Sequence, residues 1–109
     1  MTNVINLEDF RTPKAKIFTG RDRGEQVRKD SKIDEIEAKF ETVEFIIPDN
    51  LFSINPSFFE ELFINVVEKL GEKSFYEKFT FTNQGSYNYE KPLKEAISRI
   101  LREKTALDK

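Results

Sequence analysis

A hydroxyl group near the start of a predicted helix is the feature of this sequence best suited to chemistry. Ser57 lies within Ile54-Asn55-Pro56-Ser57-Phe58-Phe59-Glu60-Glu61-Leu62, which follows the apolar run 43–47. The first amide groups of a helix have no helical partner and carry positive partial charge, so they favour a carboxylate or a phosphate. Ser57 is therefore either a helix cap or a residue at which a phosphate is added or recognised.

The two roles have different consequences for this segment. As a structural element, Asn55 can cap the helix with Pro56 at its first position, or Ser57 can cap it and form a capping box with Glu60. As a phosphoacceptor, Ser57 would gain about −1.5 to −2 charges near pH 7, which Glu60 and Glu61 would oppose. Phosphorylation would then change how this surface meets a partner more than it changes the fold. The predicted partner-binding residues are Asn55, Pro56, Ser57, Phe58, Glu60 and Glu61.

A second candidate is the glycine- and arginine-rich segment Phe18-Thr19-Gly20-Arg21-Asp22-Arg23-Gly24, with Val27-Arg28 after it. Glycines and arginines at a strand-to-helix turn can surround an anion or a nucleotide phosphate. The segment lacks the phosphate-loop lysine and the dinucleotide glycine spacing. The simpler interpretation, which we favour, is a tight turn whose arginines pair with Asp22 and Glu25. The predicted anion-binding residues are Gly20, Arg21, Arg23 and Arg28.

Composition argues against an enzyme. The 109-residue chain contains no cysteine and no histidine. Thiolate chemistry, disulfides, the commonest general base and the commonest metal ligand are therefore missing. A zinc site would need carboxylates alone, a donor set that such sites seldom use. We expect a non-enzymatic protein without catalytic residues, metal or cofactor.

Charge is distributed unevenly along the chain. Segments 1–32, 33–68 and 69–109 carry net charges of +3, −8 and +3. The acidic middle segment, which contains Ser57, would repel nucleic acid and attract a basic protein; alternatively, its carboxylates only solvate a helix and the end of a strand. No apolar run approaches the roughly 20 residues of a membrane span. We expect a cytoplasmic protein with a protein partner, and the sequence leaves homo-oligomer formation open.

The remaining pattern predicts one domain of the α/β class, bordering on α+β. Strands are predicted at 4–7, 15–18, 43–47 and 79–82. Helices are predicted at 21–28, resuming at 33–40 after Asp30-Ser31, and at 56–70; a last helix has Pro92 in its first turn and ends at about Arg102. The order β-β-α-β-α-β-α predicts a single mixed four-stranded sheet with three helices mainly on one face. The helix between the third and fourth strands requires these strands to be parallel. We expect an ordered core at 3–102 and frayed residues at 103–109.

Individual residues define several of these elements. The run 43–47 is too apolar at Ile46 to have an open face, which is typical of a central strand covered on both sides. Apolar residues at helical spacing from Phe59 to Leu70 form one stripe, with Glu60 and Glu61 on the opposite face. Gly71 should end this helix. The predicted cap of the last helix is Ser86 or Asn88, because Pro92 fits only in its first turn.

The order of these motifs resembles the small bacterial STAS-like domain family of unknown function, which is related to sulfate transporter and anti-sigma factor antagonist domains. The resemblance covers about Lys16 to Arg102. It rests on the turn Gly20-Arg21 with Gly24, on Ser57-Phe58 followed by Glu60-Glu61-Leu62, and on Phe79-x-Phe81-x-Asn83.

The resemblance implies a regulatory role. In anti-sigma factor antagonists, a partner kinase with the histidine-kinase-like ATPase fold phosphorylates the serine at the position that Ser57 would occupy. The implied function is a partner-switching component that binds such an ATPase or another regulator through the segment from Asn55 to Glu61. The alternatives are an anion- or nucleotide-sensing domain at the Gly20–Arg28 turn, and a phage- or host-encoded interaction protein without phosphorylation.

Overall fold

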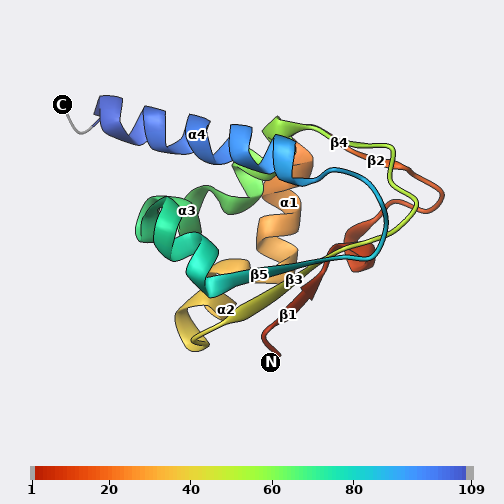
Figure 1. The fold of residues 1–109 in the computed structure, drawn as a ribbon, viewed down its shortest axis with the longest axis horizontal. Coiled ribbons are helices and arrows are strands. Elements are labelled where there is room, and N and C mark those ends of the chain that lie inside the picture. Colours follow the sequence, from red (N-terminus) through yellow and green to blue (C-terminus); the bar gives the residue numbers. More distant parts are fainter. Residues whose placement is uncertain (1, 108–109) are drawn as a thin grey trace.

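The strands of this protein form two small parallel sheets rather than the predicted single mixed sheet (Figure 1). The structure is a computed structural model that describes residues 2–107. The strands are β1 (Val4–Asn6), β2 (Ile17–Phe18), β3 (Val43–Ile47), β4 (Ser53–Ile54) and β5 (Phe79–Asn83). The helices are a 3-10 turn (Leu7–Phe10), α1 (Arg21–Ser31), α2 (Ile33–Lys39), α3 (Pro56–Lys78) and α4 (Glu90–Leu107). The α/β class and the parallel pairing of β3 with β5 are confirmed.

The three-stranded sheet has the order β1-β3-β5, with β3 in the centre. Phe45 pairs with Ile5 on β1 and with Phe81 on β5. Helices α1, α3 and α4 lie on the same side of this sheet (Figure 1). Alternate residues of β3 are buried on that side, whereas Glu44 and Ile46 are only half-buried. The predicted covering of β3 on both faces is therefore wrong, and Ile46 lies on a partly open face between Asn6 and Thr82.

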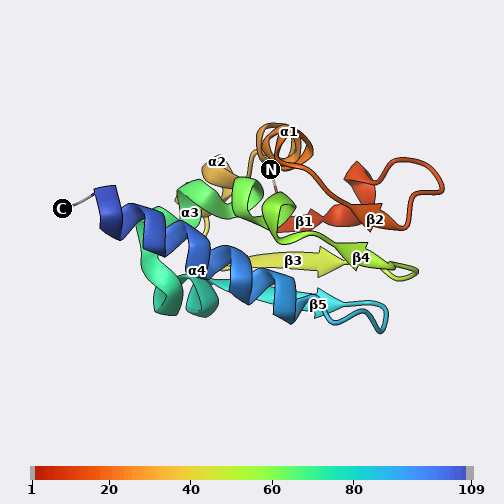
Figure 2. The same cartoon turned by 90° about the horizontal axis from the view of Figure 1, so that it is seen from above.

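The second sheet joins β2, which lies within the predicted strand 15–18, to β4, which lies where the sequence predicted only a connection. Ile17 pairs with Ser53 and Phe18 with Ile54, in parallel. Residues 48–52 place β4 beyond the carboxyl end of β3 (Figure 2). Strand β2 pairs with β4 at that position and does not join the larger sheet. Pro48 helps to end β3, because proline has no amide hydrogen to donate to a ladder.

Outside α3, the helices differ from the prediction at three boundaries. The first helical region divides into α1 and α2 at Lys32, which adopts a left-handed conformation with φ 58°, rather than at Asp30-Ser31. Residues 2–107 therefore contain four α-helices instead of three. Helix α4 begins after Tyr89, so neither Ser86 nor Asn88 is at the capping position, although Pro92 does lie in the first turn. The helix continues past Arg102 to Leu107, although residues 103–109 were predicted to fray. Residues 108–109 lie outside the described part of the chain.

Helix α3 is the centre of the molecule. It packs against α1 on one side and against α4 on the other (Figure 2). Its buried face carries the predicted apolar stripe, and Phe63 contacts the rings of Phe45 and Phe75 at centroid distances of 5.2 and 5.3 Å. Most of the eleven phenylalanines are at least half-buried, as expected for side chains with large apolar area and no polar group.

Helix α3 is interrupted at Gly71, whose φ of 80° and ψ of 168° are not helical. Gly71 therefore breaks the helix as predicted, but a second helical segment, which was not predicted, continues to Lys78. The buried carboxylate of Glu37 on α2 accepts hydrogen bonds from Lys69 at 2.8 Å and from Lys78 at 3.2 Å. Because these lysines lie on either side of Gly71, Glu37 connects the two segments.

Among residues 2–107, no helix is both long enough and apolar enough to cross a membrane.

Candidate functional site

Asn55, rather than Ser57, caps helix α3. The Asn55 side-chain oxygen accepts a hydrogen bond of 2.8 Å from the Ser57 amide, and Pro56 takes the first helical position. The capping box with Glu60 is not formed, because Ser57 lies inside the helix rather than at the cap, and the Glu60 carboxylate bonds to Arg21 instead. Among the hydrogen bonds of residues 2–107, none uses the Ser57 hydroxyl, and this side chain is half-buried. The hydroxyl is therefore not required to begin the helix.

Helices α1 and α3 cross closely at Gly24. A Cβ atom at this position would collide with the carbonyl oxygen of Phe58 and lie 2.9 Å from the Cβ of Glu61. Only glycine allows so close an approach of the two backbones. The role of Gly24 is therefore to bring the glycine–arginine segment against the first turns of α3, so that the two segments predicted as separate sites meet.

Arginines from α1 and α4 neutralise both carboxylates of the first turns of α3. Glu60 is 1% exposed, and its oxygens lie 3.1 Å from Arg21 and 3.8 Å from Arg99. Glu61 lies 3.5 Å from Arg21 and 3.4 Å from Arg28, which also donates to the Glu61 carbonyl oxygen. The expected placement of Glu60 on a solvent face is wrong, because α1 and α4 cover both flanks of α3.

The same contacts engage two of the arginines of the predicted anion site. Arg21 and Arg28 bond to Glu60 and Glu61, as described above. Arg23 points elsewhere and donates to the Phe10 carbonyl oxygen and to Gln26. The hydrogen bond and the negative charge of Glu60 raise the pKa of Arg21, with a smaller contribution from Glu61. An anion at this turn would have to compete with two carboxylates of the chain itself.

The part of the α3 start that solvent can reach is smaller than predicted. Phe58 is fully buried against Phe18, with ring centroids 5.1 Å apart, and Glu60 is buried under its arginines. Asn55 is exposed, and Pro56 and Ser57 are half-buried. Of the six predicted contact residues, Phe58 and Glu60 are therefore structural.

Two features beside this start were missed in the sequence. Phe52 is 79% exposed at the entry to β4. A cavity of about 220 Å³ lies between the β4–α3 junction and the start of α4, where the Tyr87 hydroxyl accepts a hydrogen bond of 3.1 Å from the Ile54 amide. The residues that line it are Ser53, Ile54, Asn55, Pro56, Tyr87, Lys91, Pro92 and Glu95. The sequence indicates the exposure of Phe52 only weakly: this residue follows the turn Pro48-Asp49-Asn50 and does not lie in a predicted strand.

Comparisons with known proteins give no relative of this chain. No protein-family model matches the sequence, and neither a curated protein nor a solved structure matches it.

Proposed function

We propose that this protein is a non-enzymatic, STAS-like regulatory module that binds a protein partner through the start of α3, with Ser57 as the residue that switches binding. The observation that carries the proposal is that Asn55, and not Ser57, caps the helix. Asn55 binds the amide of Ser57, so the Ser57 hydroxyl is free to be modified without loss of the helix start.

The charges around Ser57 support a phosphoacceptor more than the sequence suggested. Glu60 and Glu61 are within one turn of Ser57, and as free carboxylates they would oppose a phosphate. In the folded chain both are paired with arginines, and Arg21 remains 54% exposed beside them. The start of α3 also supplies a positive helix dipole, which stabilises a phosphate. The local cost of phosphorylation is therefore lower than the acidic sequence implies.

The accessible surface at this position fits a protein partner. Asn55, Pro56 and Ser57 are followed by buried residues, so the contact would be shallow and would extend over neighbouring Phe52 and Ile17, which are 79% and 49% exposed. Exposed aromatic side chains are favoured at the centres of protein interfaces. On the strength of the STAS-like motif order, the partner class that we propose is a regulator with the histidine-kinase-like ATPase fold.

The test is a phosphorylation and binding assay with purified ATPases of this class from the source organism. We expect ATP-dependent phosphate incorporation that mass spectrometry locates at Ser57 and that Ser57→Ala abolishes. Ser57→Asp should weaken binding by about tenfold or more, because it places a charge in a desolvated contact.

Ser74→Asp is the matched control, since Ser74 is an exposed serine on the second segment of the same helix. It should leave binding unchanged. Equal affinities for wild type, Ser57→Ala and Ser57→Asp, together with no phosphate at Ser57, would refute the switch.

A further inference from the structure

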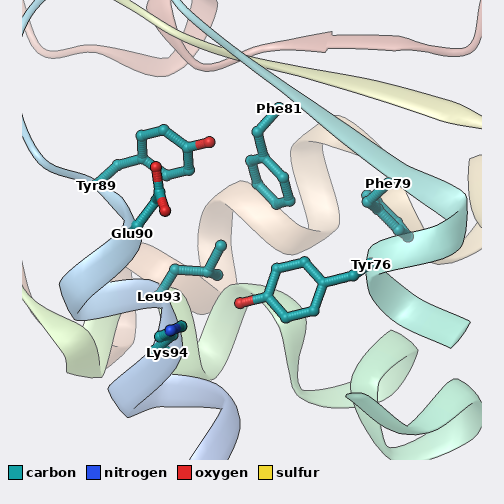
Figure 3. A pocket seen from close by; sticks show the side chains of 7 residues that line it. All are labelled: Tyr76, Phe79, Phe81, Tyr89, Glu90, Leu93 and Lys94. Atoms are coloured by element: carbon teal, nitrogen blue, oxygen red, sulfur yellow. The ribbon is translucent and has the colours of Figure 1, made fainter. Parts of the chain in front are cut away.

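A second cavity, of about 310 Å³, lies at the other end of α3 (Figure 3). Its walls come from the α3 segment after Gly71, from strand β5, and from the start of α4 together with Tyr89 just before it. The residues that line it are Tyr76, Phe79, Phe81, Tyr89, Glu90, Leu93 and Lys94. Nothing in the proposed partner contact at Ser57 uses these residues.

Packing with the core fixes the rings of this cavity. Phe81 stacks on Tyr89 with centroids 5.5 Å apart, and Phe79 stacks on Phe75 at 4.8 Å. Tyr76 contacts the edge of Phe75 at 5.5 Å and is 39% exposed. In Figure 3, Tyr76, Phe81 and Tyr89 surround a common space above Leu93. A ligand would therefore meet aromatic walls that are already in place.

The cavity lining carries one carboxylate and one ammonium group, and a second carboxylate lies nearby. Glu90 lines it, and Glu72 is close enough to act on the Tyr76 hydroxyl; Lys94 is the positive lining residue, and its side chain is exposed. Burial, followed by the charges of these carboxylates, raises the pKa of Tyr76, and burial together with Glu90 raises the pKa of Tyr89. Both rings are therefore neutral phenols at physiological pH, and no phenolate forms at the site.

We propose that this cavity binds a small organic cation of the alkylammonium class. A ring face attracts a cation within about 6 Å of its centroid, and quaternary ammonium groups are the ligands that clusters of such rings recognise. The aromatic rings of Tyr76, Phe81 and Tyr89 line the space, Leu93 supplies an apolar floor, and the carboxylate of Glu90 supplies the counter-charge. A neutral apolar ligand would gain only from the floor and the rings, and an anion would meet two carboxylates, Glu72 and Glu90, against the single ammonium group of Lys94.

The experiment compares three probes of similar shape and different charge. Amide and methyl NMR spectra of the wild-type protein are recorded during titration with choline, with the neutral 3,3-dimethylbutan-1-ol and with the anion 3,3-dimethylbutanoate, at constant ionic strength. We expect saturable shifts for choline confined to 76–81 and 89–94, with affinity about tenfold higher than for the neutral alcohol. The anion should bind more weakly than either.

Variants test the residues that carry the attraction. Tyr89→Leu removes a ring and retains an apolar side chain, and Glu90→Gln removes an exposed carboxylate while keeping its shape; each should lower choline affinity by about three- to tenfold. Glu77→Gln is the control, since Glu77 is an exposed carboxylate on the same α3 segment outside the lining. Equal affinities for choline and the neutral alcohol, tighter binding of the anion, or no saturable shift with any probe would each overturn the proposal.

Discussion

The two ends of α3 use charged and aromatic residues in opposite ways. At the start, charged side chains of the two predicted sites, Arg21 and Arg28 on α1 and Glu60 and Glu61 on α3, pair with one another, and Arg99 on α4 joins them. At the far end, aromatic side chains that look like core residues line a cavity. The comparison teaches that residue type alone does not distinguish a functional group from a structural one. A side chain is structural where the fold places a partner beside it, and it is available to a ligand where the fold does not.

The strongest test of this contrast is the close crossing at the start of α3. Gly24→Ala should lower the free energy of unfolding by about 3 kcal/mol, because the added methyl collides with the Phe58 backbone and the helices must separate. Urea denaturation measures the change. At an open helical site, the same substitution would instead stabilise the protein by about 1 kcal/mol.

The sign of the effect is therefore decisive. Asp30→Ala, at an exposed position of the same helix, should change stability by less than about 0.5 kcal/mol. A Gly24→Ala variant as stable as wild type would show that α1 and α3 do not depend on this approach.

The ion pairs at the start of α3 should have a smaller effect. Glu60→Gln should cost about 1–2 kcal/mol, since the buried group loses its charge while Arg21 and Arg99 remain partly solvated. Glu95→Gln, which removes an exposed pair with the same Arg99, should cost less than about 0.5 kcal/mol. Equal losses for both variants in urea denaturation would mean that burial of Glu60 adds nothing.

Near Gly71, where α3 is interrupted, the contribution of Glu37 to the stability of the fold should depend on pH. Burial raises the pKa of Glu37, but hydrogen bonds and charges from Lys69 and Lys78 outweigh it, so the pKa lies below its ordinary value of 4.5. The folded state therefore favours the carboxylate. This contribution is complete above pH 4.5 and is lost as pH falls through the lowered pKa.

Glu37→Gln should consequently destabilise the protein more at pH 7 than at pH 3. The difference between the two losses should be about 1 kcal/mol or less. Denaturant titrations at the two pH values measure the difference. Glu35→Gln, an exposed neighbour on α2, serves as the control. A loss that is the same at pH 7 and pH 3 would contradict the proposed pairing across Gly71.

The elements that the sequence predicted well are those in which a local pattern is long enough to be specific. The β-branched and aromatic run at Val43–Ile47 and the apolar stripe along α3 each determine their element by residue type and spacing. Strand β4, with only Ser53 and Ile54, is too short for any periodicity to identify. It exists because Phe18 and Ile54 are buried side by side, which is a tertiary effect.

The candidate sites were harder to predict for a related reason. A pattern around Ser57 marks a helix start, but it does not show that Arg99, far along the chain, covers Glu60. Likewise, nothing near Tyr76 indicates that Phe81 and Tyr89 face the same space. Partners of this kind come from separate segments, so they are visible only after the helices have packed.

The order in which the strands pair has a consequence for how the chain folds. Val4 pairs with Glu44, Ile17 with Ser53 and Val43 with Phe79, so partners are 36 to 40 positions apart and every pairing passes over one intervening strand. Among the described strands, no hairpin can form early and guide the next contact. Loop-closure entropy must be overcome before each ladder contributes, and such non-local pairing slows folding. Because the pairings overlap along the chain, a cut anywhere between Val4 and Phe79 separates paired strands. The domain is therefore not divisible into smaller units that fold independently.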